Sequence, residues 1–138
     1  MIVWLNGAFG AGKASCAHEL HRRIPGSFVY DPENIGYFLR RNTPKSMHAA
    51  DFQDDPLWRA FNCRILRDLS QRYSGTIIVP MTLVRRAYFD EIITRLRTEG
   101  ADIRHYILWA SPETLTRRLS RRREGRRANG PLPPRLRA

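Results

Sequence analysis

Cysteine is scarce in this 138-residue chain, and so are long apolar runs. The two cysteines, Cys16 and Cys63, are too few for a disulfide framework, which favours a reducing compartment. The longest nearly apolar run, from Thr76 to Val84, is about half the length that a transmembrane helix needs. The first residues also lack the basic start and apolar centre of a signal peptide. We therefore expect a cytoplasmic protein without a membrane span.

Acidic residues are also few, with 13 against 24 basic ones and a formal net charge of +11. Nine arginines and one glutamate fall between Arg117 and Ala138, whereas the rest of the chain is close to neutral. A charge block confined to one end is typical of a solvated helix face or tail, and equally of a surface that binds phosphate. We expect no nucleic-acid partner, and peripheral contact with an anionic membrane stays open.

Apolar strands alternate with amphipathic helices along the chain. We expect strands at 2–5, 27–30, 76–80 and 106–109, and helices at 13–23, 34–41, 57–73, 88–99 and 111–122. This alternation predicts an α/β fold with a parallel four-stranded sheet and flanking helices, whose ligands bind beyond the carboxyl ends of the strands. Residues 42–56 look like a loop or a small mobile subdomain, and the Pro- and Arg-rich residues 126–138 like a disordered tail.

A glycine-rich segment joins the first expected strand to the first expected helix. The sequence Gly7-Ala8-Phe9-Gly10-Ala11-Gly12-Lys13-Ala14 fits the phosphate-loop pattern G-x-x-x-x-G-K-[ST] at every place but the last. In that pattern, backbone N–H groups and a helix N-terminus surround phosphate oxygens, and the lysine reaches the β and γ phosphates. Residues 1–125 are therefore expected to form one P-loop, kinase-like domain that binds ATP.

The last place of the motif carries Ala14, which has no hydroxyl to offer Mg²⁺. Ser15 follows about 100° further round the helix, so its hydroxyl is expected to point away from the metal. We expect residues Gly7–Ser15 to bind phosphate, and metal-assisted transfer to be weaker than in a complete motif.

Two carboxylates follow the second expected strand, which we place beside the phosphate loop. Asp31 could accept a proton from a substrate hydroxyl or help to hold Mg²⁺, and Glu33 stands near it. Asp31-Pro32 could equally serve only to turn the chain. The third strand ends in Pro80-Met81-Thr82, without an acid, so Asp31 is the best candidate for both the base and the metal ligand.

Arg118 and Arg122 are four residues apart on the last expected helix, so they share one face. Their guanidinium groups could close over nucleotide phosphates as a catalytic lid, or they could simply be solvated. The cysteines and the four histidines lack the spacing of a zinc site. We expect all three tryptophans, Trp4, Trp58 and Trp109, to lie in the core.

Several blocks of sequence together resemble the tunicamycin resistance protein family: Asn6–Lys13, Glu19–Arg23, Tyr30–Glu33, Asp51–Gln53, Pro56–Asn62, Ile78–Thr82, Ala110-Ser111 and Glu113–Leu115. The resemblance runs from Met1 to about Gly125 and implies an ATP-binding domain with an adenylate-kinase-like fold. It places ATP at Gly7–Lys13, the substrate near Asp31, Glu33, Arg40 and the range from Asp51 to Arg59, and a lid at Arg118 and Arg122. Similar small-molecule kinases use a carboxylate after the second strand as base.

Two departures from the family pattern affect the expected function. Ala14 stands where the family has threonine, and the similarity ends near Gly125, as in a truncated or frameshifted chain. The first hypothesis is an ATP-binding resistance protein that phosphorylates or sequesters a nucleoside-like antibiotic. The alternatives are a degenerate, non-catalytic nucleotide binder and a nucleic-acid binder that uses the arginine-rich end. Whether the protein is an enzyme, and its oligomeric state, are left open by the sequence.

Overall fold

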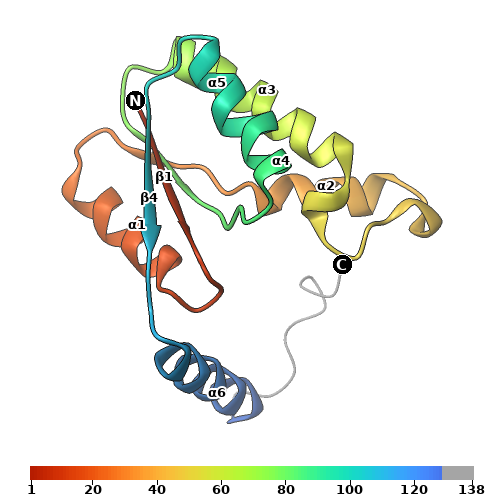
Figure 1. The fold of residues 1–138 in the computed structure, drawn as a ribbon, viewed down its shortest axis with the longest axis vertical. Coiled ribbons are helices and arrows are strands. Elements are labelled where there is room, and N and C mark those ends of the chain that lie inside the picture. The colour runs from red at the N-terminus through yellow and green to blue at the C-terminus, as the bar shows by residue number, and fades with distance from the viewer. Residues whose placement is uncertain (129–138) are drawn as a thin grey trace.

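The computed structural model describes residues 1–128, with side chains described as far as Glu124. Strands and helices alternate along this part of the chain (Figure 1). The strands are β1 (Ile2–Gly7), β2 (Phe28–Val29), β3 (Ile77–Pro80) and β4 (Ile103–Leu108). The helices are α1 (Lys13–Arg23), α2 (Glu33–Asn42), the short 3₁₀ turns η1 (Lys45–Met47) and η2 (Phe52–Asp54), α3 (Pro56–Arg72), α4 (Arg86–Phe89), the π-helical η3 (Asp90–Thr94), α5 (Arg95–Thr98) and α6 (Pro112–Ala128).

The four strands form one parallel sheet in the order β2-β3-β1-β4. This confirms the predicted α/β class, but it corrects the predicted neighbour of the phosphate loop. β3 pairs with β1, so the strand that leads to Asp31 lies one place further away. The physical reason is burial: residues 77–79 of β3 are fully buried and suit the centre of the sheet, whereas β2 has only two residues and exposes Phe28.

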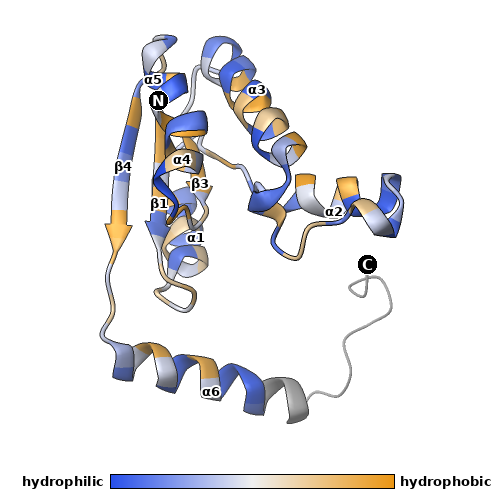
Figure 2. Cartoon of the chain, turned by 45° about the vertical axis from the view of Figure 1, so that its right-hand side comes forward, coloured by the Kyte–Doolittle hydropathy of each residue, from blue (hydrophilic) through white to orange (hydrophobic). Residues whose placement is uncertain are grey.

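Side chains alternate between the two faces of the sheet and make two hydrophobic clusters. Ile2 and Trp4 pack with residues of α3 and the α4–α5 segment, such as Trp58 and Ile92. Val3 and Leu5 pack on the other face with α1. Figure 1 shows α1 on one side of the sheet and α3 with α4–α5 on the other, and Figure 2 shows that their apolar faces turn inward.

Two of the helices begin earlier or end later than the sequence pattern predicts, whereas α1 has the predicted bounds. Residues Arg86–Thr98 form one continuous helix through a π-helical turn, two residues earlier than expected at the start. α6 continues to Ala128 instead of ending near Arg122, so the expected boundary at Gly125 falls inside a helix. Arginine and glutamate are good helix formers, and one internal glycine costs only about 1 kcal/mol relative to alanine. The remainder of the predicted tail, residues 129–138, lies outside the described residues.

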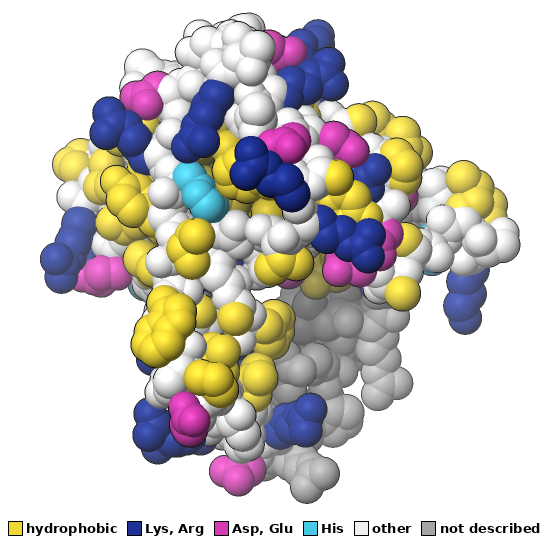
Figure 3. All heavy atoms as spheres, in the orientation of Figure 1, with side chains coloured by type: hydrophobic (Ala, Val, Ile, Leu, Met, Phe, Trp, Pro, Cys, Tyr) yellow, Lys and Arg dark blue, Asp and Glu magenta, His cyan; other side chains and the backbone are white. Residues whose placement is uncertain are grey.

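β4 is an edge strand in the described part of the sheet, and this explains a second correction. Trp4 and Trp58 are buried as predicted, but Trp109 is 82% exposed because it follows β4 on the way to α6. Tyr106 and Ile107 are exposed as well, and apolar side chains gather on this face where β4 leads to α6 (Figure 3). Among the described residues, no helix is long and apolar enough to cross a membrane.

The predicted loop between α2 and α3 is ordered around two 3₁₀ turns. η2 packs its Phe52 ring directly over Gly36, where a Cβ atom would collide with the ring. Asp51 and Asp55 each accept a hydrogen bond from a backbone N–H two residues later, which caps η2 and α3 respectively. The segment therefore forms a wall with a defined position beside the carboxyl edge of the sheet.

Candidate functional site

The glycines of the phosphate loop, Gly7–Lys13, hold backbone conformations that other residues rarely adopt. Gly7, Gly10 and Gly12 have φ angles of 140°, 85° and 99°. At position 7 there is also no room for a side chain, because a Cβ atom would lie 2.5 Å from the carbonyl oxygen of Leu108 on β4. Gly12 precedes the first turn of α1, so the loop curls back to the helix N-terminus, where backbone N–H groups are available to an anion.

Asn6 ties the start of this loop to the segment that follows β3. Its buried side-chain oxygen accepts hydrogen bonds from the Gly7 N–H at 2.8 Å and the Leu83 N–H at 2.9 Å. Its amide nitrogen donates to the Leu83 carbonyl at 2.8 Å and lies 3.2 Å from Nε2 of His105. Burial, and next Arg97, lower the pKa of His105, which favours the neutral ring as acceptor. The glycine motif does not reveal this role of Asn6, because its partners are 77 and 99 positions away.

Lys13 lies inside the curve of the loop. Its Nζ donates to the carbonyl oxygens of Gly7 and Ala8, at 3.0 and 2.9 Å. Burial is the largest cause that lowers its pKa, the nearby Arg122 lowers it further, and Glu33 acts in the opposite direction. The ammonium is thus held at the loop by neutral carbonyls, where a phosphate would be a stronger partner.

A pocket of about 480 Å³ opens over the loop at the carboxyl edge of the sheet. Of the predicted site residues, it brings together Phe9, Gly10, Gly12, Lys13, Ala14, Asp31, Glu33 and Arg122. The same pocket is lined by Asp51, Phe52 and Gln53 of the η2 segment, and by Pro80, Met81 and Thr82 after β3. We call this the phosphate pocket. Ser15, the last of the residues expected to bind phosphate, is exposed and does not line this pocket.

The two carboxylates enter this pocket from the segment between β2 and α2. Asp31 is exposed, and its Oδ1 accepts a hydrogen bond from the Glu33 N–H at 2.9 Å, so it turns the chain as well as lining the pocket. Glu33 is half-buried. Burial and then Asp31 raise its pKa, whereas Lys13 lowers it. The pocket therefore holds one exposed carboxylate and one half-buried carboxylate whose pKa is raised.

Helix α6 reaches the phosphate loop through one pair of arginines. Arg118 donates from Nη1 to the Gly10 carbonyl at 3.1 Å, and the guanidinium of Arg122 lies 5.7 Å from the centre of the Phe9 ring. The Leu115 and Leu119 side chains would contact a Cβ atom at Gly10. The spacing of four residues thus places both predicted lid arginines on the loop side of α6, with Arg122 in the pocket.

The other two predicted arginines lie outside the phosphate pocket. Arg40 stacks on Phe52 at 4.2 Å and donates to the carbonyl groups of residues 49 and 50. The side chain of Arg59 is only 11% exposed; it pairs with Glu91 at 2.5 Å and donates to the Gln53 carbonyl at 2.6 Å. Arg59 therefore does not line the pocket, although it was predicted to lie near the substrate. It instead holds the backbone of Gln53, which forms part of the pocket wall behind which Arg59 lies.

The cysteines and histidines of the described chain do not form a metal centre. Cys16 and Cys63 are free thiols in the structure. Within the described residues there is no group of three or more histidine, cysteine and acidic side chains that could hold a metal ion. The side chains with oxygen atoms that line the phosphate pocket are those of Asp31, Glu33, Asp51, Gln53 and Thr82. They suit a hard ion such as Mg²⁺, which is bound in nucleotide sites by one or two carboxylates, water and the phosphates themselves.

Comparison with known proteins decides the family. A family model described as an AAA domain matches residues 2–133. The structure of the Deinococcus radiodurans tunicamycin resistance protein is 37% identical, with a TM-score of 0.77 over 87% of this chain and 68% of that one. This chain belongs to the tunicamycin resistance protein family. A search of curated proteins finds no match.

More distant structures share the fold of this family. An unliganded sugar kinase from Janibacter sp. is 20% identical, with a TM-score of 0.64 over 96% of this chain and 79% of that one. The Mycobacterium tuberculosis APS kinase in complex with AMPPNP and APS is 22% identical, with a TM-score of 0.56 over 93% and 73%. The family member described here thus has a phosphate-loop fold that is shared with kinases.

The support that Arg59 gives to the pocket wall is testable. Arg59→Gln should lower the free energy of unfolding by about 1.5–3 kcal/mol, because a nearly buried guanidinium loses charged hydrogen bonds to Glu91 and to the Gln53 carbonyl. Urea denaturation measures this change. The matched control is Arg64→Gln on the exposed face of α3, which should change stability by less than about 0.5 kcal/mol. Equal stability of the two variants would refute the supporting role of Arg59.

Proposed function

We propose that this protein is a cytoplasmic ATP-dependent phosphotransferase that modifies a hydroxyl of a small, nucleoside-like antibiotic of the tunicamycin type. One observation carries the proposal: the phosphate loop, two carboxylates and a lid arginine line a single pocket. The antibiotic is suggested by the 37% identity to a tunicamycin resistance protein. Two free thiols and a P-loop domain are in keeping with a reducing compartment that contains ATP.

ATP would bind with its phosphates along the loop. The N–H groups at the start of α1 would surround the β phosphate, and Lys13 would exchange the Gly7 and Ala8 carbonyls for β and γ oxygens. Arg122, which already lies at the pocket, would neutralise part of the γ-phosphate charge. Lys13 and Arg122, whose charges repel each other in the free protein, would then both face an anion.

The acceptor would lie between the γ phosphate and the wall made by η2. The Asp31 carboxylate would take the proton from the acceptor hydroxyl as that oxygen bonds to the γ phosphorus, while the bond to the β-phosphate oxygen breaks and ADP leaves. Asp31 is the carboxylate that we propose as the base, because it is exposed and lines the pocket, where an acceptor can reach it. Glu33 is placed to bind the acceptor.

Mg²⁺ would screen the charge of the phosphates when it enters with ATP. Asp31 is the residue that we propose for holding it, through water, while Ala14 has no hydroxyl to contribute. This departure favours a specific alternative, in which the protein binds nucleotide and antibiotic but transfers phosphate slowly or not at all. Resistance would then come from sequestration. The nucleic-acid alternative is less supported, because Arg118 and Arg122 face the phosphate loop.

Lys13→Ala tests the nucleotide site. It should weaken ATP binding by about 30- to 1,000-fold, equivalent to about 2–4 kcal/mol, because a charged donor to the β and γ phosphates is lost from a partly buried site. Isothermal titration calorimetry measures the affinity, with Arg64→Ala as a matched loss of one cation outside the pocket. Unchanged affinity for ATP in Lys13→Ala would show that the loop does not bind phosphate in the proposed way.

Asp31→Asn separates phosphoryl transfer from sequestration. The asparagine oxygen can still accept the Glu33 N–H hydrogen bond, so the turn is kept while the proton acceptor is lost. With tunicamycin as acceptor, ADP formation should fall by about 100-fold or more, and ATP affinity should stay within a few-fold. Asp68→Asn, on an exposed part of α3, serves as the control. Full activity of Asp31→Asn would exclude Asp31 as the base, and a wild-type protein that binds both ligands without forming ADP would favour sequestration.

Ala14→Thr tests the missing metal ligand. The new hydroxyl should tighten ATP binding in the presence of Mg²⁺ but not in EDTA, because it adds a direct ligand at a helix start where threonine costs only about 0.5 kcal/mol. The matched control is Ser15→Ala, which removes a hydroxyl that does not line the pocket. ATP affinity is measured with and without Mg²⁺ in all three proteins. An affinity that is equally independent of Mg²⁺ in wild type and Ala14→Thr would show that Ala14 is not the metal defect.

A further inference from the structure

The proposed base, Asp31, is an exposed residue between two buried neighbours. Tyr30 is 9% exposed and Pro32 is fully buried, whereas Asp31 lines the phosphate pocket. β2 has only two residues, so the sheet holds little of the segment that carries Asp31. The position of its carboxylate therefore depends on what holds the residues on either side of it.

The residue before Asp31 is held by its side chain as well as by the sheet. The Tyr30 hydroxyl donates to Oδ1 of Asn62 on α3 at 2.6 Å, and the Tyr30 backbone N–H donates to the Ile78 carbonyl of β3 at 2.9 Å. Burial, and next the charge of Asp31, raise the pKa of Tyr30, so its hydroxyl keeps the proton that it donates. Tyr30 is thus fixed from two directions.

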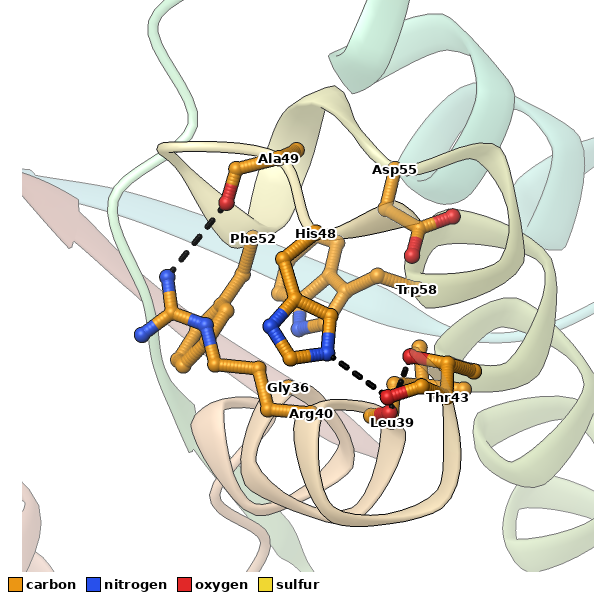
Figure 4. Close-up of a pocket in the computed structure, with 9 residues that line it drawn as sticks. All are labelled: Gly36, Leu39, Arg40, Thr43, His48, Ala49, Phe52, Asp55 and Trp58. Carbon is orange, nitrogen blue, oxygen red and sulfur yellow. Dashed lines mark hydrogen bonds between the residues drawn. The ribbon is translucent and has the colours of Figure 1, made fainter. Parts of the chain in front are cut away.

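The residue after Asp31 is held by the indole of Trp58, also on α3. Its Nε1 donates to the Pro32 carbonyl at 3.0 Å, and the Trp58 side chain is fully buried. Trp58 lines a narrow cleft among side chains of α2 and of the segment around η2 (Figure 4). The Pro32 carbonyl also accepts the Ile35 N–H at 3.2 Å, so Pro32 is tied to α3 and to the start of α2.

A buried amide is a costly choice for the core-facing side of α3. Asn62 is fully buried, where an apolar side chain would pack without losing contact with water. Its Oδ1 accepts from Tyr30 and its Nδ2 donates to the Trp58 carbonyl at 2.9 Å, so both ends of the amide have partners. Trp58 and Asn62 are four residues apart and share one face of the helix. That face carries both hydrogen-bond partners of the segment around Asp31.

We infer that Trp58 and Asn62 are positioning residues that act through Asp31. By holding the residue before it and the residue after it, α3 keeps the Asp31 carboxylate at the phosphate pocket before any acceptor arrives. Arg59 on the same helix holds the Gln53 backbone of the η2 wall, so α3 also fixes the space between that wall and Asp31. The catalytic use of this position rests on the proposed function, whereas the position itself rests only on the hydrogen bonds.

Amide exchange tests the position of Asp31 without any ligand. The N–H groups of residues 33–35 all donate to Asp31 or Pro32, so their exchange with water reports how firmly these two residues are held. In the full chain labelled with ¹⁵N, Tyr30→Phe and Trp58→Phe should each speed exchange at residues 33–35 by about threefold or more. Unchanged exchange in both variants would overturn the inference.

Tyr73→Phe is the matched control for this measurement. It also removes one tyrosine hydroxyl that donates a hydrogen bond, but the acceptor is the Gly26 carbonyl, and neither residue lines the phosphate pocket. Exchange at residues 33–35 should stay as in wild type. Equal acceleration in the control and in Tyr30→Phe would mean that any lost hydroxyl has this effect, and would count against the positioning role.

A double-mutant cycle tests the action through Asp31, with ATP and tunicamycin as substrates. Trp58→Phe should lower kcat for ADP formation by about tenfold and leave the KM for tunicamycin and the ATP affinity within about threefold, because the binding groups are kept. In the Asp31→Asn background the same substitution should have no further effect, because the group that it positions is already lost. A purely structural role would lower kcat equally in both backgrounds, and that result would overturn the inference.

A paired substitution separates position from stability. Tyr30→Phe combined with Asn62→Leu removes donor and acceptor together, so no buried polar atom of this pair is left without a partner. Stability should return towards that of wild type, while kcat stays about tenfold low because Tyr30 is no longer tied to α3. Recovery of kcat together with stability would refute the positioning role, even if Tyr30→Phe alone folds poorly.

The outcome is separable from that of the proposed function. If wild type binds ATP and tunicamycin without forming ADP, the phosphotransferase proposal fails, and faster exchange at residues 33–35 in the two variants still supports the position of Asp31. If ADP forms and requires Asp31 while Tyr30→Phe and Trp58→Phe behave as Tyr73→Phe does, the positioning role fails alone.

Discussion

The buried side chain of Asn6 holds the carboxyl edge of the sheet together. It joins the end of strand β1 to the segment after β3 by three hydrogen bonds to the backbone of Gly7 and Leu83. The hydroxyl of Thr82, the residue before Leu83, donates to the Gly7 carbonyl at 2.7 Å. The side-chain amide of Gln53 in turn donates to the Thr82 carbonyl at 2.6 Å. The wall of the pocket is thus connected to the phosphate loop through one chain of hydrogen bonds. Because these groups are buried or partly buried, an unmade bond in the chain would leave a polar atom without water.

The electrostatics of the site follow from this arrangement. Lys13, Arg118 and Arg122 approach a loop whose own carbonyl groups supply only partial negative charge. Asp31 and Glu33 line the same pocket, and burial raises the pKa of the half-buried Glu33. A site with cations on the loop side and a carboxylate on the acceptor side separates the two tasks of phosphoryl transfer, which are charge neutralisation and proton removal.

Phe52 joins helix α2 to the wall of the phosphate pocket. It packs over Gly36 on one side and under the Arg40 guanidinium on the other, and it lines both the phosphate pocket and the adjoining cleft. The lack of a side chain at Gly36 is what lets the ring approach α2 so closely. A segment that seems from its composition to be a loop is therefore an ordered part of the site, positioned by Arg59 behind it and by Phe52 at its face.

The sequence by itself determined the alternation of strands and helices, the glycine pattern of the phosphate loop, and the position of Arg118 and Arg122 on one helix face. Each of these is a pattern of residues that are close together in the chain. Asp31, Glu33 and Lys13 could be expected at one edge, since parallel strands all end there. Only the tertiary structure decided that β3 separates β2 from β1, that Trp109 is exposed, and that Arg59 lies behind the pocket wall. Each of these depends on partners far away in the chain, such as Glu91 for Arg59 or Leu83 for Asn6, and burial against such partners leaves no local pattern to recognise.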